Sequence, residues 1–161
     1  MGNVVQNMTI SEHHIESLFV ELKIGDSVVL AGVVYRLPSG DRSLFTDRFE
    51  GIVSLAGQKN YGGRLICGDF NLNLLNINGD LNVSNCFGLL SSYAYMSLIT
   101  RPTRITNETC TLIDNIFTQD MGNVVSGIIP HDLSDHYIIF MVHSVFFRTP
   151  SLKVNPWNIG C

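Results

Sequence analysis

The sequence predicts one α/β domain built around a mixed β-sheet. Segments with the patterns of strands and helices follow one another in the order strand, strand, helix, strand, helix, strand, strand, strand. Hydrophobic residues make up 45% of the 161 residues and charged residues only 15%, a balance typical of a packed domain. No internal repeat or linker divides the chain. We therefore expect a single domain over residues 1–147 and a loose C-terminal tail over residues 148–161.

The first half of the chain predicts two strands and a helix. Residues 17–23 alternate between apolar and polar side chains, and a glycine–aspartate turn then leads to the apolar run 28–35. Such a run is typical of a strand that is buried on both faces. Apolar residues then recur at helical spacing, which predicts an amphipathic helix over residues 41–56 with Asp41 or Ser43 as its N-cap.

The second half predicts the rest of the sheet and a second helix. Residues 64–67 form a short apolar strand before a polar loop, and residues 86–93 have the pattern of a helix. Residues 112–118, 124–129 and 136–147 have the pattern of three further strands. Strands and helices that follow one another in this way suit a layered α/β domain.

Bulk properties argue against several classes of protein. No segment reaches the roughly 18 consecutive apolar residues that span a bilayer, and residues 1–10 lack the basic and apolar regions of a secretory signal. We therefore expect an intracellular protein without a membrane partner. The four cysteines form no CxxC pair, which argues against structural zinc. Without a secretory route we expect their thiols to be reduced.

The net charge bears on the choice of partner. The chain carries a formal charge of −4 and has a pI near 5.6, whereas proteins that bind DNA usually present a basic surface to the phosphates. An acidic total still allows a nucleic-acid partner where carboxylates surround a metal ion, because the cation is missing from the count. Net charge by itself therefore leaves DNA open as a partner.

One candidate site follows the third predicted strand. Asp69 and Asn71 lie two residues apart there, so in an extended segment both side chains point to the same side. A carboxylate can transfer a proton or orient a water, and an amide can donate a hydrogen bond to a phosphate oxygen. An ordinary turn also uses glycine, aspartate and asparagine, and this alternative stays open.

Two more segments carry polar side chains beside or within apolar strands. Asp135 and His136 stand directly before the end strand, and an adjacent Asp and His can serve a metal and a proton transfer. Asp114 lies inside the apolar segment 112–118, where a buried carboxylate needs a partner, and a histidine that it orients would be one. A polar loop and a surface-facing aspartate are the alternatives.

The end of the second predicted strand is the fourth segment of interest. Tyr35 and Arg36 offer a phenol and a guanidinium there, and both groups suit a phosphate. An aromatic strand end followed by a solvated arginine is the simpler interpretation of this segment when it is taken by itself.

These four segments, in this order, resemble the endonuclease/exonuclease/phosphatase superfamily. The stretches are VVYRLPSGD, LICGDFNLNLL, RPTRITNETCTLIDNIFT and LSDHYIIF, and ESLFVEL extends the resemblance toward the N-terminus. In particular they look like the endonuclease domain of non-LTR (LINE-type, jockey-like) retrotransposon polyproteins. The resemblance implies a DNase I-like layered α/β sandwich, DNA as the partner and a nuclear site of action. It also implies a chain that is a monomer or part of a longer polyprotein.

The resemblance further implies a role for each polar residue. His136 would be the general base that activates a water, with Asp114 holding its ring. Asp69 would orient the attacking water or protonate the leaving oxygen. Asn71 would hold the scissile phosphate, and Tyr35 would contact the phosphate or the leaving group.

The remaining roles concern the metal and further substrate contacts. By the same resemblance Asp135 would help to hold a divalent cation, Mg²⁺ or Mn²⁺, which neutralises charge on the phosphate in the transition state. Thr111 would donate a further hydrogen bond to the substrate. Arg36 would stand near the phosphate without a defined role.

The chain departs from the family pattern at its beginning. The family starts with a strand that carries an asparagine, followed by a strand that carries a metal-binding glutamate. No asparagine matches the first, and Glu12, Glu16 and Glu21 lie in the wrong context for the second. We expect Glu21 to belong to the outer part of the sheet. We also expect a chain cut short at its N-terminal end, with exposed apolar surface and weak or absent metal-dependent cleavage.

Three alternatives stay open at this point. The chain can be a phosphatase or a lipid phosphodiesterase of the same superfamily, since these share one active centre. It can be an inactive remnant of a mobile element and no enzyme. It can also be an α/β binding domain in which all four segments are turns, although that reading needs four coincidences in order.

Overall fold

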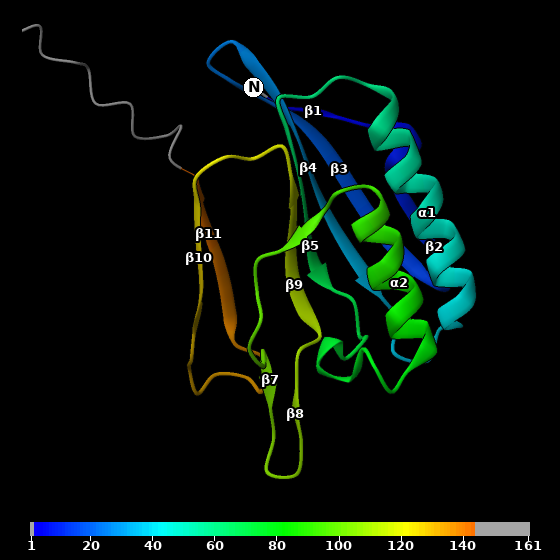
Figure 1. Cartoon of the computed structure of the whole chain (residues 1–161), viewed down its shortest axis with the longest axis vertical. Coiled ribbons are helices and arrows are strands. Elements are labelled where there is room, and N and C mark those ends of the chain that lie inside the picture. The colour runs from blue at the N-terminus through cyan, green and yellow to red at the C-terminus, as the bar shows by residue number, and fades with distance from the viewer. Residues whose placement is uncertain (1, 144–161) are drawn as a thin grey trace, which may run out of the picture.

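The fold stacks two helices, a seven-stranded mixed sheet and a two-stranded antiparallel sheet as successive layers (Figure 1). The computed structural model describes residues 2–143. Residues 144–147 of the last predicted strand and the predicted tail, 148–161, lie outside the described residues. Neither described helix is long and apolar enough to cross a membrane.

The large sheet has the strand order β1-β3-β4-β5-β9-β6, and β2 also pairs with β3. β4 and β5 run parallel, and every other pair of strands in this sheet is antiparallel. The strands are β1 (Gly2–Val4), β2 (Ile10–Glu12), β3 (Ile15–Ile24), β4 (Ser27–Arg36), β5 (Gly63–Asp69), β6 (Met96–Ser97) and β9 (Asp114–Gln119). The strands predicted over 17–23, 28–35, 64–67 and 112–118 are thereby confirmed as β3, β4, β5 and β9.

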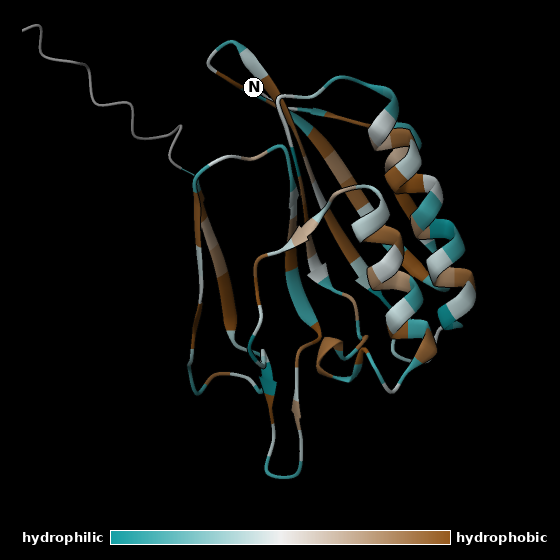
Figure 2. Cartoon of the chain, viewed as in Figure 1, coloured by the Kyte–Doolittle hydropathy of each residue, from teal (hydrophilic) through white to brown (hydrophobic). Residues whose placement is uncertain are grey.

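Both helices, α1 (Arg42–Gln58) and α2 (Leu81–Ser92), cover one face of the large sheet (Figure 1). Asp41, rather than Ser43, caps α1, because its carboxylate accepts hydrogen bonds from two backbone amides of the first turn. Asp80 caps α2 in the same way, so α2 begins before the cysteine at which the sequence predicted it. Polar residues lie on the outer sides of the helices and apolar residues toward the sheet (Figure 2).

The second sheet lies on the opposite face of the large sheet and confirms the strand predicted over 124–129. It consists of β10 (Val124–Ile129) and β11 (Ile138–His143), which run antiparallel. Ile139 and Met141 of β11 pack against a buried cluster that Ile116 of β9 helps to form. The molecule therefore has a main core between the helices and the large sheet and a smaller one between the two sheets.

β4 is not buried on both faces, contrary to the sequence prediction. Leu30 and Val34 face the helices and are fully buried, whereas Val33 and Tyr35 are 54% and 38% exposed. Leu18 of β3 lies on the same outer face and is also exposed. Apolar composition predicted burial, but the second sheet packs on the part of this face that β5 and β9 form. The expected exposed apolar surface is therefore present over β3 and β4.

Five of the described strands were not predicted, and all five are two or three residues long. Two of them, β7 (Arg104–Ile105) and β8 (Cys110–Thr111), form a separate hairpin. A segment of two or three residues is too short to show a periodic pattern, so whether it forms a strand depends on its pairing with other strands. Two short 3-10 helices, η1 (Gln6–Met8) and η2 (Leu74–Asn76), complete the described elements.

Candidate functional site

The polar residues of interest gather where β4 and β5 end and β9 begins. Tyr35 pairs with Asp69, and Asp69 pairs with Asp114, so these three residues form a row across three adjacent strands. Residues paired across strands point to the same face of a sheet. The carboxyl end of parallel strands is the usual place for a site in an α/β sheet.

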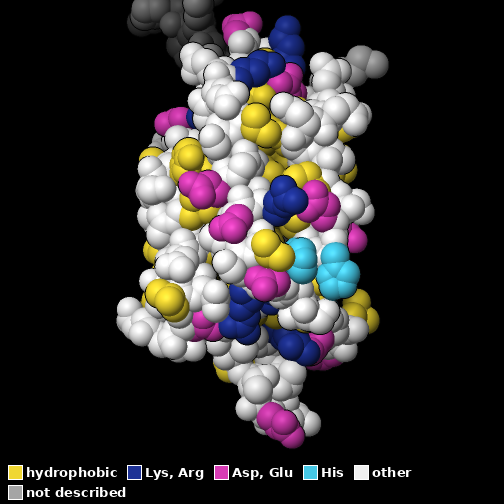
Figure 3. All heavy atoms as spheres, turned by 90° about the vertical axis from the view of Figure 1, so that its right-hand side faces the viewer, with side chains coloured by type: hydrophobic (Ala, Val, Ile, Leu, Met, Phe, Trp, Pro, Cys, Tyr) yellow, Lys and Arg dark blue, Asp and Glu magenta, His cyan; other side chains and the backbone are white. Residues whose placement is uncertain are grey.

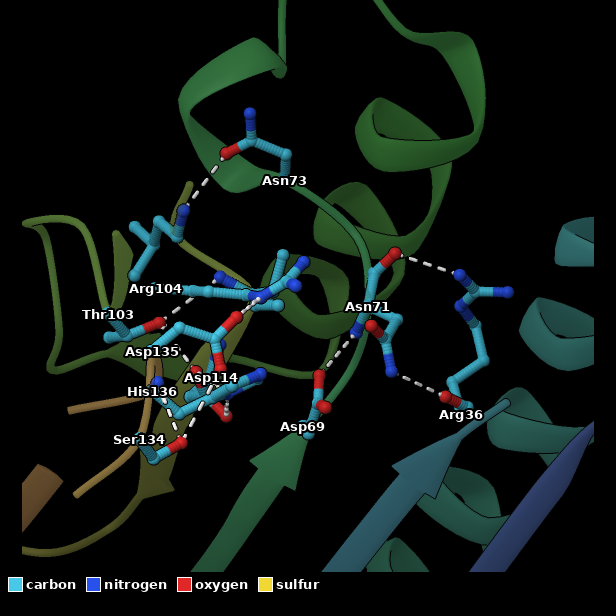
Figure 4. Close-up of polar contacts among 12 residues, drawn as sticks. Arg36, Asp69, Asn71, Asn73, Thr103, Arg104, Asp114, Ser134, Asp135 and His136 are labelled. Carbon is cyan, nitrogen blue, oxygen red and sulfur yellow. Dashed lines mark hydrogen bonds and ion pairs between the residues drawn. The ribbon is translucent and has the colours of Figure 1, made fainter. Parts of the chain in front are cut away.

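His136 lies beside this row and contacts Asp114. Its Nδ1 atom is 3.2 and 3.1 Å from the two carboxylate oxygens of Asp114 (Figure 4). The segment that carries His136 is fixed by the neighbouring backbone, since the N–H of Tyr137 donates to the carbonyl of Thr103 at 2.6 Å. When Nδ1–H donates to the carboxylate, Nε2 is the ring nitrogen that can accept a proton.

Thr103 is a site residue to which the sequence analysis gave no role. It is fully buried, and its hydroxyl donates to Oδ2 of Asp114 at 2.7 Å and accepts from the backbone N–H of Asp114 at 3.0 Å. Thr103 therefore fixes the carboxylate that holds the histidine. The PTRIT stretch of the family resemblance contains this threonine, but the sequence does not show which carboxylate it meets.

Asp69 is partly buried and is held by the loop that follows it. Its Oδ1 atom accepts a hydrogen bond from the backbone N–H of Asn71 at 2.9 Å (Figure 4). Burial raises the pKa of Asp69 above its ordinary value; the Asn71 N–H opposes this shift, and the neighbouring carboxylate of Asp114 adds to it. Burial therefore disfavours the ionised form of Asp69.

Asp69, Asp114 and His136 form a group that fits a divalent cation. One ligand atom from each lies within 4.8 Å of the others, and no other such group occurs within residues 2–143. Carboxylate oxygens are the ligands that Mg²⁺ and Mn²⁺ prefer. Both carboxylates line a cavity of 410 Å³ whose other walls are mostly apolar. Two carboxylates side by side thus place negative charge where a cation would bind.

Asp135, predicted as the metal ligand, is not part of this group. Its carboxylate accepts a hydrogen bond from Nε of Arg104 at 2.7 Å, and this contact lowers the pKa of Asp135. The prediction rested on its position next to His136. Asp135 lies in a bend of the chain, and its side chain reaches Arg104 instead of the group formed by Asp69, Asp114 and His136.

Arg36 and Thr111, predicted as substrate contacts, also lie elsewhere. Arg36 is only 1% exposed, and its guanidinium donates to backbone carbonyls. The hydroxyl of Thr111 is buried and has no hydrogen-bond partner among the described residues. Neither the Arg36 guanidinium nor the Thr111 hydroxyl is exposed to solvent in this structure, so both substrate contacts stay predictions that the structure does not support.

Tyr35 and Asn71 remain accessible from the site. The ring of Tyr35 lies on the exposed outer face, next to Asp69 in the sheet register. One side-chain N–H of Asn71 donates to the carbonyl of Arg36 at 2.8 Å, and the side-chain amide also interacts with the carboxylate of Asp69. The structure therefore brings together Tyr35, Asp69, Asn71, Asp114 and His136 of the predicted residues.

Solved structures match this arrangement of elements, although no protein-family model and no curated protein matches the sequence. The endonuclease domain of TRAS1, a telomere-specific non-LTR retrotransposon, matches with a TM-score of 0.67 at 15% identity, over 89% of this chain and 68% of that one. An endonuclease/exonuclease/phosphatase family protein from Leptotrichia buccalis matches with a TM-score of 0.57 at 14% identity, over 78% and 52%. D. rerio TDP2, complexed with a single-strand DNA product, matches with a TM-score of 0.60 at 13% identity, over 88% and 65%.

The chain has the endonuclease/exonuclease/phosphatase fold. The expected layered, DNase I-like α/β class is thereby confirmed. At these identities the likeness concerns the fold, and the chain spans about half to two thirds of the matched proteins. Activity and substrate must therefore be argued from the residues of the site.

The face of this endonuclease/exonuclease/phosphatase fold that carries the helices shows no basic patch. Acidic and basic side chains are interspersed there with uncharged ones (Figure 3). A surface that follows a nucleic-acid backbone is usually basic. The candidate phosphate site therefore lies at the end of the sheet that carries Asp69 and Asp114.

Proposed function

We propose that this chain is a metal-dependent phosphodiesterase that nicks DNA weakly, in the manner of a retrotransposon endonuclease. The observation that carries the proposal is the group of Asp69, Asp114 and His136, with ligand atoms within 4.8 Å of one another at the carboxyl end of the central strands. The structural likeness to an endonuclease domain and to a protein solved with a DNA product supports DNA as the substrate. A genomic DNA substrate implies a nuclear site of action.

His136 is the proposed general base. Water attacks phosphorus, the bond from phosphorus to the leaving oxygen breaks, and Nε2 of His136 takes the proton of the water. Asp114 accepts the hydrogen bond from Nδ1 and stabilises the imidazolium that forms. Thr103 holds the Asp114 carboxylate through its hydroxyl, so the pair is oriented before the substrate binds.

The carboxylates of Asp69 and Asp114 would hold the divalent cation, Mg²⁺ or Mn²⁺. When bound, the cation supplies positive charge that stabilises the phosphate oxygens of the transition state. Asn71 would donate a side-chain N–H, and Tyr35 its phenol, to the phosphate. As a ligand of the cation Asp69 acts in its ionised form, so the leaving oxygen takes its proton from solvent water.

A nicking assay on supercoiled plasmid tests this proposal. With millimolar Mg²⁺ or Mn²⁺ we expect slow conversion to the open circle, which EDTA stops and His136→Ala abolishes. The partly exposed His131 of the same segment provides the matched control, and His131→Ala should nick at the wild-type rate. No cleavage by the wild type, or cleavage that survives EDTA and His136→Ala, would overturn the proposal.

Two further measurements separate the alternatives that share this fold. Release of phosphate from inositol phosphates at a rate above DNA nicking would indicate a phosphatase instead. A midpoint of thermal unfolding that millimolar Mg²⁺ leaves unchanged would support a remnant that binds no metal, because a ligand of the native state must raise that midpoint.

A further inference from the structure

Arg36 makes an unusual set of contacts at the end of β4. Its Nη2 donates to the carbonyl of Asn71 at 2.8 Å (Figure 4). Its Nε donates to the carbonyl of Phe70, also at 2.8 Å. Its Nη1 donates to the carbonyls of Leu37 and Gly40 at 2.9 and 3.0 Å. One guanidinium therefore joins the loop after β4 to the loop after β5.

This guanidinium is buried without an acidic partner. Arg36 is 1% exposed and forms no ion pair with any described residue. Burial lowers the pKa of Arg36 from its ordinary value, since the charged form loses its hydration. A buried charge whose hydrogen bonds all go to neutral carbonyls is a costly way to stabilise a fold. We therefore expect a role for Arg36 in the loop after β5, to which it donates hydrogen bonds.

That loop contains a residue in an unfavourable backbone conformation. Asn71 has a φ of 47°, in the left-handed region that residues other than glycine rarely adopt. Two hydrogen bonds join Arg36 and Asn71. Nη2 of Arg36 donates to the carbonyl of Asn71, and Nδ2 of Asn71 donates to the carbonyl of Arg36, both at 2.8 Å. In this conformation the N–H of Asn71 reaches Oδ1 of Asp69.

We propose that Arg36 is a positioning residue for the metal and phosphate site. It holds Asn71 in the left-handed conformation, and Asn71 in turn holds the carboxylate of Asp69 and presents its amide to the phosphate. A lysine at this position keeps the charge but cannot reach carbonyls of both loops, since only the guanidinium is forked. The inference rests on the proposed function, because it assigns a purpose to Arg36 at that same site.

Arg64 of the neighbouring strand β5 provides a matched control. It is also buried, and it donates from Nε to the carbonyl of Ala56 at 3.0 Å and from Nη2 to the carbonyl of Lys59 at 2.9 Å. It differs in having an acidic partner, Asp120, at 2.9 Å. Arg64 lies near the start of β5, at the opposite end of the strand from Asp69. Its contacts serve the end of α1 and not the site.

The test compares Arg36→Lys with Arg64→Lys in the full chain, with Mn²⁺ as the probe. Calorimetric titration gives the Mn²⁺ affinity, and plasmid nicking gives kcat and KM. We expect Arg36→Lys to weaken Mn²⁺ binding by roughly 10-fold or more and to lower kcat more than it changes KM. Arg64→Lys should lower the midpoint of thermal unfolding and leave the Mn²⁺ affinity of the folded protein unchanged.

A second pair of variants keeps the inference testable if Arg36→Lys does not fold. Asn71→Ala and Asn71→Gly both remove the side-chain amide, but only alanine disfavours the left-handed conformation. Mn²⁺ binding should be weaker in Asn71→Ala than in Asn71→Gly. Equal affinity in these two variants, or wild-type affinity in Arg36→Lys, would overturn the inference and leave the proposed function standing. Absence of Mn²⁺ binding in the wild type would instead overturn the proposed function, and the inference with it.

Discussion

The two ends of the parallel pair β4 and β5 are built on different principles. At the amino end Arg64 meets Asp120, and Lys59 meets Glu21 at 2.6 Å, so opposite charges are paired. At the carboxyl end Asp69 and Asp114 face each other across the sheet, while the hydrogen bonds of the buried Arg36 all go to carbonyls.

The pKa shifts express the same contrast. Hydrogen bonds from Lys59 and Tyr61 lower the pKa of Glu21, whereas burial raises the pKa of Asp69. The ionised carboxylate is thus favoured by the fold at one end and disfavoured at the other. A carboxylate whose ionised form is disfavoured by burial is typical of a site that a bound ligand completes. The carboxyl end is therefore the better candidate for the site.

The largest expected effect tests whether the carboxyl end carries chemistry. Asp114→Asn removes the negative charge that orients His136 and stabilises its protonated form. We expect the nicking rate to fall by about 10²–10⁴-fold, the usual contribution of a general base. At the amino end, Asp120→Asn should leave the rate unchanged. Equal rates for the wild type and Asp114→Asn would remove the functional difference between the two ends.

The next effect concerns the close approach of backbones at the carboxyl end. Gly68 has a φ of 148°, and a Cβ atom there would lie 1.8 Å from the carbonyl oxygen of Val34. Gly68→Ala should therefore lower the free energy of unfolding by about 3 kcal/mol or more. Gly51→Ala, in α1 with no atom in the way, should instead raise it by about 0.5–1 kcal/mol. Urea unfolding of both variants measures the free energy of unfolding. An unchanged value for Gly68→Ala would contradict the close approach of the two backbones.

A smaller effect distinguishes a threonine that serves the site from one that does not. Thr103→Val removes the hydroxyl that Asp114 uses, so we expect nicking to fall about 10-fold and stability to fall by about 1–2 kcal/mol. Thr118 of β9 is equally buried, but its hydroxyl has no partner among the described residues. Thr118→Val should lower neither the nicking rate nor the stability. Similar losses in the two variants would mean that Thr103 acts only through packing.

The smallest expected effect belongs to the amino end. The pKa of Glu21 is lowered, so its contribution to stability is present above the ordinary pKa of a glutamate and is lost as the pH falls through the lowered value. Glu21→Gln should therefore lower the midpoint of thermal unfolding slightly at neutral pH, and the difference should vanish once the pH lies below the lowered pKa of Glu21. A difference that grows toward acid would have the wrong sign for this explanation.

The sequence was a good guide to the layered fold. Alternation in β3, helical spacing in α1 and the N-cap at Asp41 are local patterns, and the structure confirms all three. The outer face of β4 was misjudged because exposure depends on which strands the second sheet covers. The short strands β1 and β2 went unpredicted for a similar reason, since pairing with β3 defines them.

The candidate site was predictable in part. Motifs after or within apolar strands predicted Asp69, Asp114 and His136 as site residues, and the structure brings these three residues together. Arg36 looked like a solvated strand end, because its burial depends on two loops that fold around it. Thr103 received no role because its contact with Asp114 joins two different segments of the fold.

The measurement that tests the central claim most directly is a Mn²⁺ titration of the wild type and of Asp69→Asn. If the carboxyl end of β4 and β5 is a metal site, the wild type should bind the ion and Asp69→Asn should bind it much more weakly. Glu21→Gln, at the amino end, should bind it as the wild type does. Equal binding by the wild type and Asp69→Asn, or no binding by either, would contradict the account.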